Sequence, residues 1–194
     1  MALSEDTATV MNKMLQTVVY GPNGTGRAVA SAVSNMKVFG KTGTSSENND
    51  KWFVGGSPYY IASSWCGYET MQKMPSANLS VARSLWSEVM SKIHKGLKAR
   101  KFKESEYAVK RYYCTKTGLL ATDTCPKKAV GWYKEAFVPQ TCTSHGGTAL
   151  ETPKGIDIFD EIPSNTSSTS SNSSATSSEK QPTSSKTSSN TTTN

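Results

Sequence analysis

The sequence contains no run of about 18 apolar residues, so it predicts no membrane-spanning helix. Its start lacks the basic-then-apolar order of a signal peptide, and residues 1–4 lead directly into a helical pattern. There is also no CxxC pair, the spacing that is common in zinc and redox sites. These absences argue against a membrane span, a cleaved leader and a simple zinc finger within this stretch of sequence.

Large apolar side chains are missing from residues 164–194, which consist almost entirely of Ser, Thr and Asn. Such a segment buries too little surface to offset the entropy that is lost on ordering. The sequence therefore predicts a disordered tail over 151–194 and a globular part over 1–150.

Positive charge is concentrated in one segment. Residues 98–134 hold ten Lys and Arg against three acids, and the net charge of the whole chain is +7. Such a segment suits an anionic neighbour, such as nucleic acid, acidic lipid or a wall polymer, but it is equally a solvated basic surface. No recognisable reading element accompanies it, so we expect no nucleic-acid partner.

Apolar spacing and turn residues predict an α+β fold, an antiparallel sheet flanked by helices. Short β-rich segments over 37–42, 52–56 and 59–68 predict three strands in an antiparallel meander, after a short helix over 27–33. A first helix is predicted after an N-cap at Ser4, with helically spaced Met11, Met14, Leu15, Val18 and Val19. A second is predicted over 77–100, with a stripe of Ala82, Leu85, Trp86, Val89, Ile93 and Leu97.

Aromatic residues on these elements are expected in the core, namely Trp52, Phe53, Trp65 and Trp86. His94 is expected to act as a cation near the C-terminus of the second helix.

From Tyr112 on, the composition shifts to Cys, Gly, Pro and Thr with few aliphatic residues, which predicts a small basic module over 106–150 after a first domain over 1–105. The module holds Cys114, Cys125 and Cys142, which together with Cys66 make an even number. Disulfides, free thiols and metal ligation, with His145 three residues after Cys142, all remain open. Because neither a CxxC pair nor a zinc-like spacing is present, the sequence predicts no metal site and no cofactor.

One short run has the make-up of an anion-binding wall. From Val38 to Thr44, Lys41 stands among hydroxyls and glycines at the end of a β-type stretch. Residues 35–42 nearly match a nucleotide-binding P-loop, but strand-like residues fill the supposed cradle and Gly43 interrupts the supposed helix. Nucleotide binding is therefore not expected.

Several motifs over residues 4–95 resemble, in order and spacing, the class A, bifunctional penicillin-binding proteins. They are the helix over 3–19, Gly24-Thr25-Gly26-Arg27, Gly40-Lys41-Thr42-Gly43-Thr44-Ser45, Trp52-Phe53-Val54-Gly55 and Trp65-Cys66-Gly67-Tyr68. The resemblance implies the C-terminal part of a transpeptidase domain, whose partners are peptidoglycan stem peptides and, in a complete domain, β-lactams. It also implies a location on the outer face of a bacterial membrane.

The same resemblance implies roles for four residues. Lys41, Thr42 and Thr44 would bind the substrate carboxylate, Gly43 would let substrate backbone approach, and the Thr44 N–H would form half of an oxyanion hole. The family's Ser-x-x-Lys nucleophile and Ser-x-Asn are not found upstream of this strand. Ser34-Asn35-Met36-Lys37 has the first spacing but runs straight into the strand.

We therefore expect this chain alone to be inactive and its catalytic serine to come from a segment outside it. The alternative is a non-enzymatic protein that binds the cell wall through the basic module and the Ser/Thr tail.

Overall fold

The computed structural model describes residues 2–78 and 80–152, and all of them belong to one compact unit. The tail expected over 151–194 lies almost entirely outside the described residues. The helices and strands are α1 (Glu5–Tyr20), β1 (Phe39–Thr44), β2 (Lys51–Gly56), β3 (Ile61–Cys66), α2 (Val81–Ile93), β4 (Ala108–Cys114) and β5 (Lys128–Lys134). Within the described residues, no helix has the length and apolar character needed to cross a bilayer.

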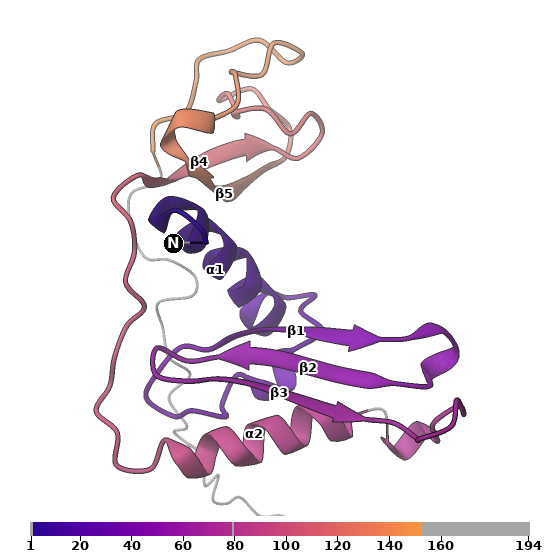
Figure 1. Ribbon diagram of the computed structural model, residues 1–194. Coiled ribbons are helices and arrows are strands. Elements are labelled where there is room, and N and C mark those ends of the chain that lie inside the picture. Colours follow the sequence, from indigo (N-terminus) through magenta and orange to yellow (C-terminus); the bar gives the residue numbers. More distant parts are fainter. Residues whose placement is uncertain (1, 79, 153–194) are drawn as a thin grey trace, which may run out of the picture. The chain divides into compact units, whose positions relative to one another are not determined.

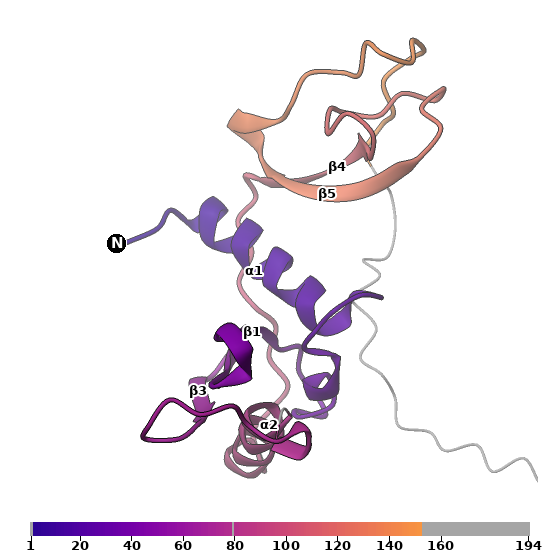
Figure 2. The ribbon, with the colours of Figure 1, turned by 90° about the vertical axis from the view of Figure 1, so that its right-hand side faces the viewer.

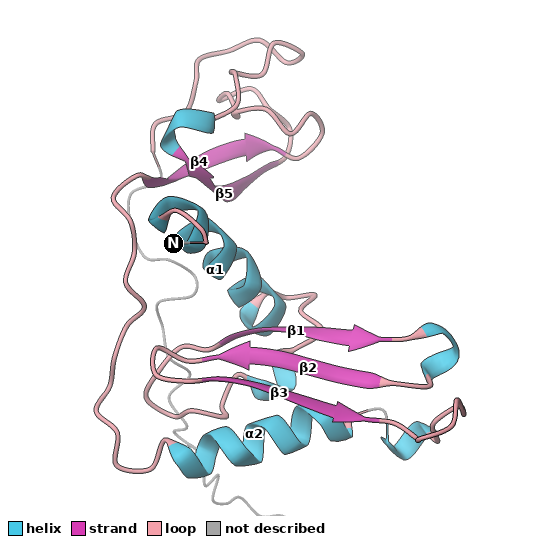
Figure 3. Cartoon of the chain, in the orientation of Figure 1, coloured by secondary structure: helices cyan, strands magenta, loops and turns pink. Residues whose placement is uncertain are grey.

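The first sheet is an antiparallel meander in the order β1-β2-β3, and α2 covers one of its faces (Figures 1 and 3). The predicted α+β class and meander are therefore confirmed. The predicted helix over 27–33 shortens to a single 3-10 turn, Arg27–Val29. The buried core between sheet and helix comprises Val19, Val29, Ala32, Val33, Met36, Val38, Phe53, Ala82, Trp86 and Met90.

Helix α2 is shorter than predicted, and of its predicted apolar stripe Ala82 and Trp86 are buried while three other residues are not. Gly96 adopts φ +79, a conformation suited to glycine, just after the helix ends. The stripe repeats every four residues through Ala82, Trp86, Met90 and His94. Leu85, Val89 and Ile93, which the sequence placed on the buried stripe, are each more than 40% exposed. They lie one position before the buried residues, so they turn away from the sheet.

The aromatic residues divide between the two faces of the sheet. Phe53 and Trp86 are buried as predicted, with ring centroids 5.0 Å apart. Trp52 and Trp65 are 46% and 44% exposed, so their predicted core position is wrong. Adjacent strand residues point to opposite faces, and Trp52 therefore lies on the face away from Phe53 and α2. There it packs against Trp65, with ring centroids 6.2 Å apart.

Helix α1 forms where predicted, but its buried side is partly polar. Met11 and Met14 are 46% and 57% exposed. The Nζ atom of Lys13 lies 2.6 Å from the Glu104 carboxylate, so the segment before β4 covers this polar side. The buried residues of the helix are Thr9, Lys13, Gln16 and Val19.

His94 is part of the core. The hydroxyl of Ser57 accepts bonds from the backbone N–H groups of Tyr59 and Tyr60, which leaves its proton for Nε2 of His94, 2.7 Å away. Nδ1 of His94 donates to the Met90 carbonyl oxygen at 2.7 Å. His94 thus lies at the C-terminal end of α2, as predicted, and its ring is buried with a hydrogen-bond partner at each nitrogen.

The residues after α2 form a second, smaller cluster. Strands β4 and β5 pair antiparallel, and the loops that follow them gather on one face of this two-stranded sheet (Figure 2). The sequence predicted a module here but not its strands. Its buried cluster comprises Cys114, Ala121, Cys125 and Cys142, with Tyr112, Leu119 and Leu150 partly buried against it.

Candidate functional site

The candidate anion-binding strand, β1, is the outer strand of the meander and pairs only with β2 among the described strands. At the turn between them, the Ser45 N–H donates to the Asp50 carbonyl oxygen directly opposite. Antiparallel pairs alternate between residues that bond across the ladder and residues that do not. Counting back from Ser45, the N–H and C=O groups of Thr44 and Thr42 therefore point away from β2, toward the outer edge.

Lys41 lies on this strand with its side chain exposed, and its Nζ donates to the Thr42 carbonyl oxygen at 2.8 Å. This contact agrees with the outward direction of the Thr42 carbonyl. Strand alternation places Lys41 on the sheet face opposite to Thr42 and Thr44. The three side chains therefore do not share one face of the sheet, and a ligand could reach all three only from the edge of β1.

Two residues that the sequence did not single out hold the threonine hydroxyls. The Thr25 hydroxyl lies 2.9 Å from the Thr42 hydroxyl, and Lys51 Nζ donates to the Thr44 hydroxyl at 3.1 Å. Lys51 stands directly opposite Thr44 in the hairpin, so it adds a second positive charge to the strand. The sequence could have indicated Lys51 through the hairpin register, because placing the turn between β1 and β2 sets Lys51 opposite Thr44.

Gly43 is directly opposite Trp52, and a Cβ atom at this position would lie only 2.9 Å from Trp52 Cβ. Real Cβ atoms essentially never approach this closely, so a larger residue would displace the tryptophan. Packing against Trp52 is therefore one reason for glycine here. Backbone access for a substrate stays a prediction.

The Ser34-to-Lys37 segment does not face Lys41. Lys37 Nζ lies 4.4 Å from the centre of the Tyr20 ring, and Asn35 donates to the Leu97 carbonyl oxygen. The segment therefore faces α1 and the residues that follow α2.

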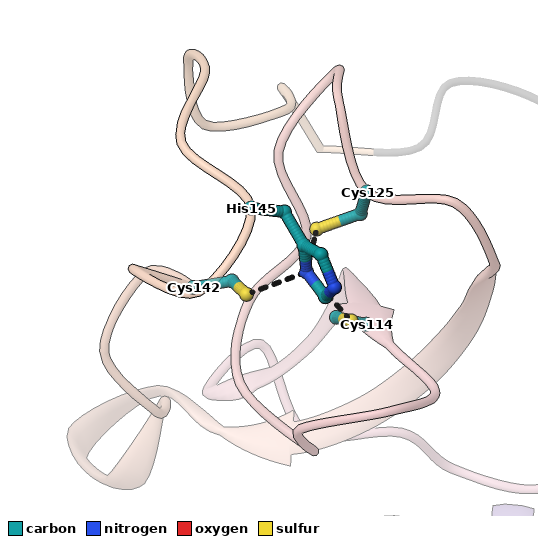
Figure 4. A group of neighbouring side chains, drawn as sticks. All are labelled: Cys114, Cys125, Cys142 and His145. Carbon is teal, nitrogen blue, oxygen red and sulfur yellow. Dashed lines mark hydrogen bonds between the residues drawn. The ribbon is translucent and has the colours of Figure 1, made fainter.

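A second group of reactive side chains lies in the β4–β5 region. Cys114, Cys125, Cys142 and His145, together called the cysteine cluster, place one ligand atom each within 4.8 Å of all the others. Cys114 ends β4, Cys125 lies in the loop before β5, and Cys142 and His145 follow β5 (Figure 4). All four cysteines of the chain are free thiols, and Cys66 lies apart in β3.

Two thiols of the cysteine cluster have a lowered pKa. The pKa of Cys142 falls from its ordinary 9.0 to about 6, chiefly because Thr117 donates a hydrogen bond to its sulfur; burial opposes this shift and His145 adds to it. For Cys114, burial raises the pKa, but hydrogen bonds from Thr117 and from the Lys116 and Thr117 backbone outweigh it, so the pKa is lowered. The thiolate is the form that reacts and ligates metals.

Comparisons with known proteins place this geometry in a family. A profile of the penicillin binding protein transpeptidase domain matches residues 1–91. These residues belong to the penicillin-binding transpeptidase family. They contain α1, the meander and most of α2, so the resemblance read from the motifs is confirmed.

The similar sequences are class A penicillin-binding proteins. Penicillin-binding protein 1A of Clostridium tetani is 29% identical over 154 residues, which cover 75% of this chain and 19% of the relative. The corresponding protein of Clostridium botulinum is 38% identical over 95 residues, covering 49% and 11%. That of Neisseria gonorrhoeae is 28% identical over 181 residues, covering 86% and 22%. The chain therefore spans about a fifth or less of these relatives.

A crystal structure of penicillin-binding protein 1A from Haemophilus influenzae has the same fold. It matches 71% of this chain and 21% of its own, with a TM-score of 0.59 and 20% sequence identity. The described residues of this chain are thus a partial penicillin-binding transpeptidase fold.

Proposed function

We propose that this chain carries the substrate-binding strand of a D,D-transpeptidase that cross-links peptidoglycan stem peptides. The observation that carries the proposal is Lys41-Thr42-Gly43-Thr44 on an outer strand, with the Thr44 N–H pointing away from β2. An outer strand offers backbone groups to an extended peptide along its open edge. Membership in the transpeptidase family supplies the peptide in question, a stem peptide that ends in D-Ala-D-Ala.

Each residue of the strand has a role in binding this peptide. Lys41 supplies positive charge for the terminal carboxylate, and the hydroxyls of Thr42 and Thr44 donate to it. Lys51, 3.1 Å from the Thr44 hydroxyl, adds positive charge at the same end. The Thr44 N–H serves as one of two donors to the oxyanion that forms on the attacked carbonyl.

The chemistry itself needs a nucleophilic serine facing β1, and residues 2–78 and 80–152 contain no Ser-x-x-Lys segment that faces this strand. In the family, the serine oxygen bonds to the penultimate D-Ala carbonyl carbon, and the bond to the last D-Ala breaks, releasing it as a free amine. An amine of a neighbouring stem peptide then attacks the ester, forming the cross-link and freeing the serine. We infer that another segment supplies this serine, on the outer face of a bacterial membrane.

Binding at the strand is tested by NMR titration of the isotope-labelled chain with a diacetylated Lys-D-Ala-D-Ala peptide. We expect shifts at Lys41, Thr42 and Thr44 that weaken when the terminal carboxylate is replaced by an amide. Lys41→Ala should abolish them. Lys92→Ala, which removes the same charge from the exposed surface of α2, should not. Shifts that are unchanged by Lys41→Ala would contradict the proposal.

The inactivity of the chain alone is tested with a fluorescent penicillin. We expect no covalently labelled band on a denaturing gel, because β-lactams acylate the family's serine. A labelled band that disappears when the chain is boiled before labelling would show that the chain holds its own nucleophile.

The alternative is a wall-binding protein without catalytic function, which the separate β4–β5 cluster and the basic segment favour. It predicts that the chain sediments with purified sacculi, that Lys41→Ala leaves this unchanged, and that deletion of residues 112–147 abolishes it. Sedimentation that depends on Lys41 and survives the deletion supports the transpeptidase strand instead.

A further inference from the structure

The cysteine cluster directs three sulfur atoms at one imidazole nitrogen. Nδ1 of His145 lies 3.3 Å from the sulfur of Cys142 and 3.6 Å from those of Cys114 and Cys125 (Figure 4). An imidazole nitrogen carries either one proton or one lone pair, so it makes one hydrogen bond well and not three. Three similar contacts to one nitrogen therefore indicate a common partner at the centre of the group.

The three nitrogen–sulfur distances match the nitrogen–sulfur edges of a zinc tetrahedron. Zinc binds cysteine sulfur at about 2.3 Å and histidine nitrogen at about 2.0–2.1 Å, which puts the nitrogen–sulfur edge at roughly 3.6 Å. The observed distances of 3.3–3.6 Å lie at or just below this value. We propose that the cysteine cluster is a structural zinc site with Cys114, Cys125, Cys142 and His145 as its four ligands.

Neighbouring groups orient the sulfur ligands as the shell around a metal site does. The backbone N–H of Thr122 donates to the Cys125 sulfur at 3.3 Å, and the buried Thr122 hydroxyl lies 3.2 Å from it. The Thr117 hydroxyl donates to the Cys142 sulfur at 3.5 Å. Hydrogen bonds of this kind fix the direction of the sulfur lone pairs and stabilise the thiolates that zinc requires.

The β4–β5 region also needs a cross-link of the kind that a bound metal provides. Its buried cluster consists of three cysteines and Ala121, with no fully buried large apolar side chain. Segments of about 40 residues usually need metals or disulfides because they bury too little apolar surface. Four protein ligands complete the tetrahedron and leave no open position, so the zinc holds the loops of this region together and does not bind substrate.

The sequence alone did not indicate this metal site, because its ligands come from three separate segments of the chain. Only Cys142 and His145 are close together, and no CxxC pair marks the others. The proposal departs from the sequence prediction, which assigned no metal. It does not depend on the transpeptidase strand, since none of its ligands lies within residues 1–91.

The first test measures the metal content of the full 194-residue chain. The chain is purified without chelator and analysed by inductively coupled plasma mass spectrometry. We expect one zinc per chain, and a zinc-free chain that binds none when zinc is added would overturn the proposal. Cys142→Ser and His145→Ala should each lose stoichiometric zinc. Cys66→Ser is the matched control and should keep it, because Cys66 lies in β3 outside the cluster.

Cobalt in place of zinc reports the geometry without any variant. We expect the strong visible bands of tetrahedral cobalt together with thiolate-to-metal charge transfer, whereas a weak octahedral spectrum would overturn the proposal. A thiol count of the denatured, chelated chain separates the disulfide alternative. Four thiols are expected, and two would show that a disulfide has replaced the zinc ligands.

A milder variant tests the surrounding shell. Thr117→Val removes the hydroxyl that bonds to Cys142 and should weaken zinc binding by about 10- to 100-fold while one zinc still binds. Thr115→Val is the control, since the Thr115 hydroxyl faces the Lys127 carbonyl oxygen and no sulfur. Equal affinities of the two variants would mean that Thr117 does not support the site.

Discussion

The meander with α2 and the β4–β5 region are stabilised by different kinds of interaction. In the first, Phe53 and Trp86 meet edge to face within a continuous apolar core. In the second, the buried cluster consists of three cysteines and Ala121, and the larger apolar side chains around it are only partly buried. One region is thus held by burial of apolar surface, whose stabilisation grows with area. The other depends on the few directed bonds of its cysteine cluster.

This difference predicts that the stability of the two regions responds differently to single substitutions. A large apolar core loses stability by degrees as single side chains are trimmed. A metal site with four ligands no longer holds its loops together when any one ligand is removed, because metal binding and folding are coupled.

The largest effect that separates the regions is expected from Trp86→Ala. Trp86 is 1% exposed, and its truncation should lower the free energy of unfolding of the meander by about 3–5 kcal/mol. Urea unfolding followed by circular dichroism measures this loss. The zinc content should not change. Leu85→Ala, at a 46% exposed position of the same helix, should change stability by less than about 1 kcal/mol, and equal losses would contradict this core.

A smaller effect is expected from Tyr20→Phe. The Val38 N–H donates to the Tyr20 oxygen at 3.0 Å, and its loss should cost about 1–3 kcal/mol at neutral pH. Burial raises the pKa of Tyr20 above its ordinary 10.0, although the Val38 bond opposes this. The wild-type contribution is therefore present below pH 10 and is lost as pH rises further, because the unfolded state ionises first. The difference between the proteins in urea unfolding should narrow above pH 10; a constant difference would contradict the buried phenol.

The smallest effect is expected on the uncovered face of the sheet. Trp52→Ser should cost no more than about 1.5 kcal/mol, because Trp52 is 46% exposed and its ring loses mainly the pairing with Trp65. Phe53→Ala, the next residue on the same strand, should cost about 3–5 kcal/mol. Thermal unfolding of both variants checks this order, and a reversal would mean that the sheet buries its other face.

The transpeptidase region was largely predictable because its signals are local. Strand periodicity and the turn residues between strands predicted the meander, and Lys41-Thr42-Gly43-Thr44 was identified by its residue types. The outward direction of the Thr44 N–H could be predicted only once the hairpin register was known. The contact of Lys51 with Thr44 also follows only from this register, whereas the contact of Thr25 with Thr42 depends on how a separate loop packs against β1.

The failures have a common physical cause. Helical spacing shows that a face is apolar but not which neighbour covers it, so Leu85 was expected to be buried and is exposed. Trp65 was misplaced because strand alternation does not show which face of the sheet is covered. The cysteine cluster joins residues 31 positions apart, and no periodicity reports contacts over such a distance.

The central claim, that the two regions are held by different forces, is tested most directly by hydrogen exchange of the full chain with and without a zinc chelator. We predict that chelation removes amide protection from residues 108–114 and 128–134 and leaves residues 39–66 protected. Protection that is unchanged everywhere, or lost equally in both regions, would contradict the account.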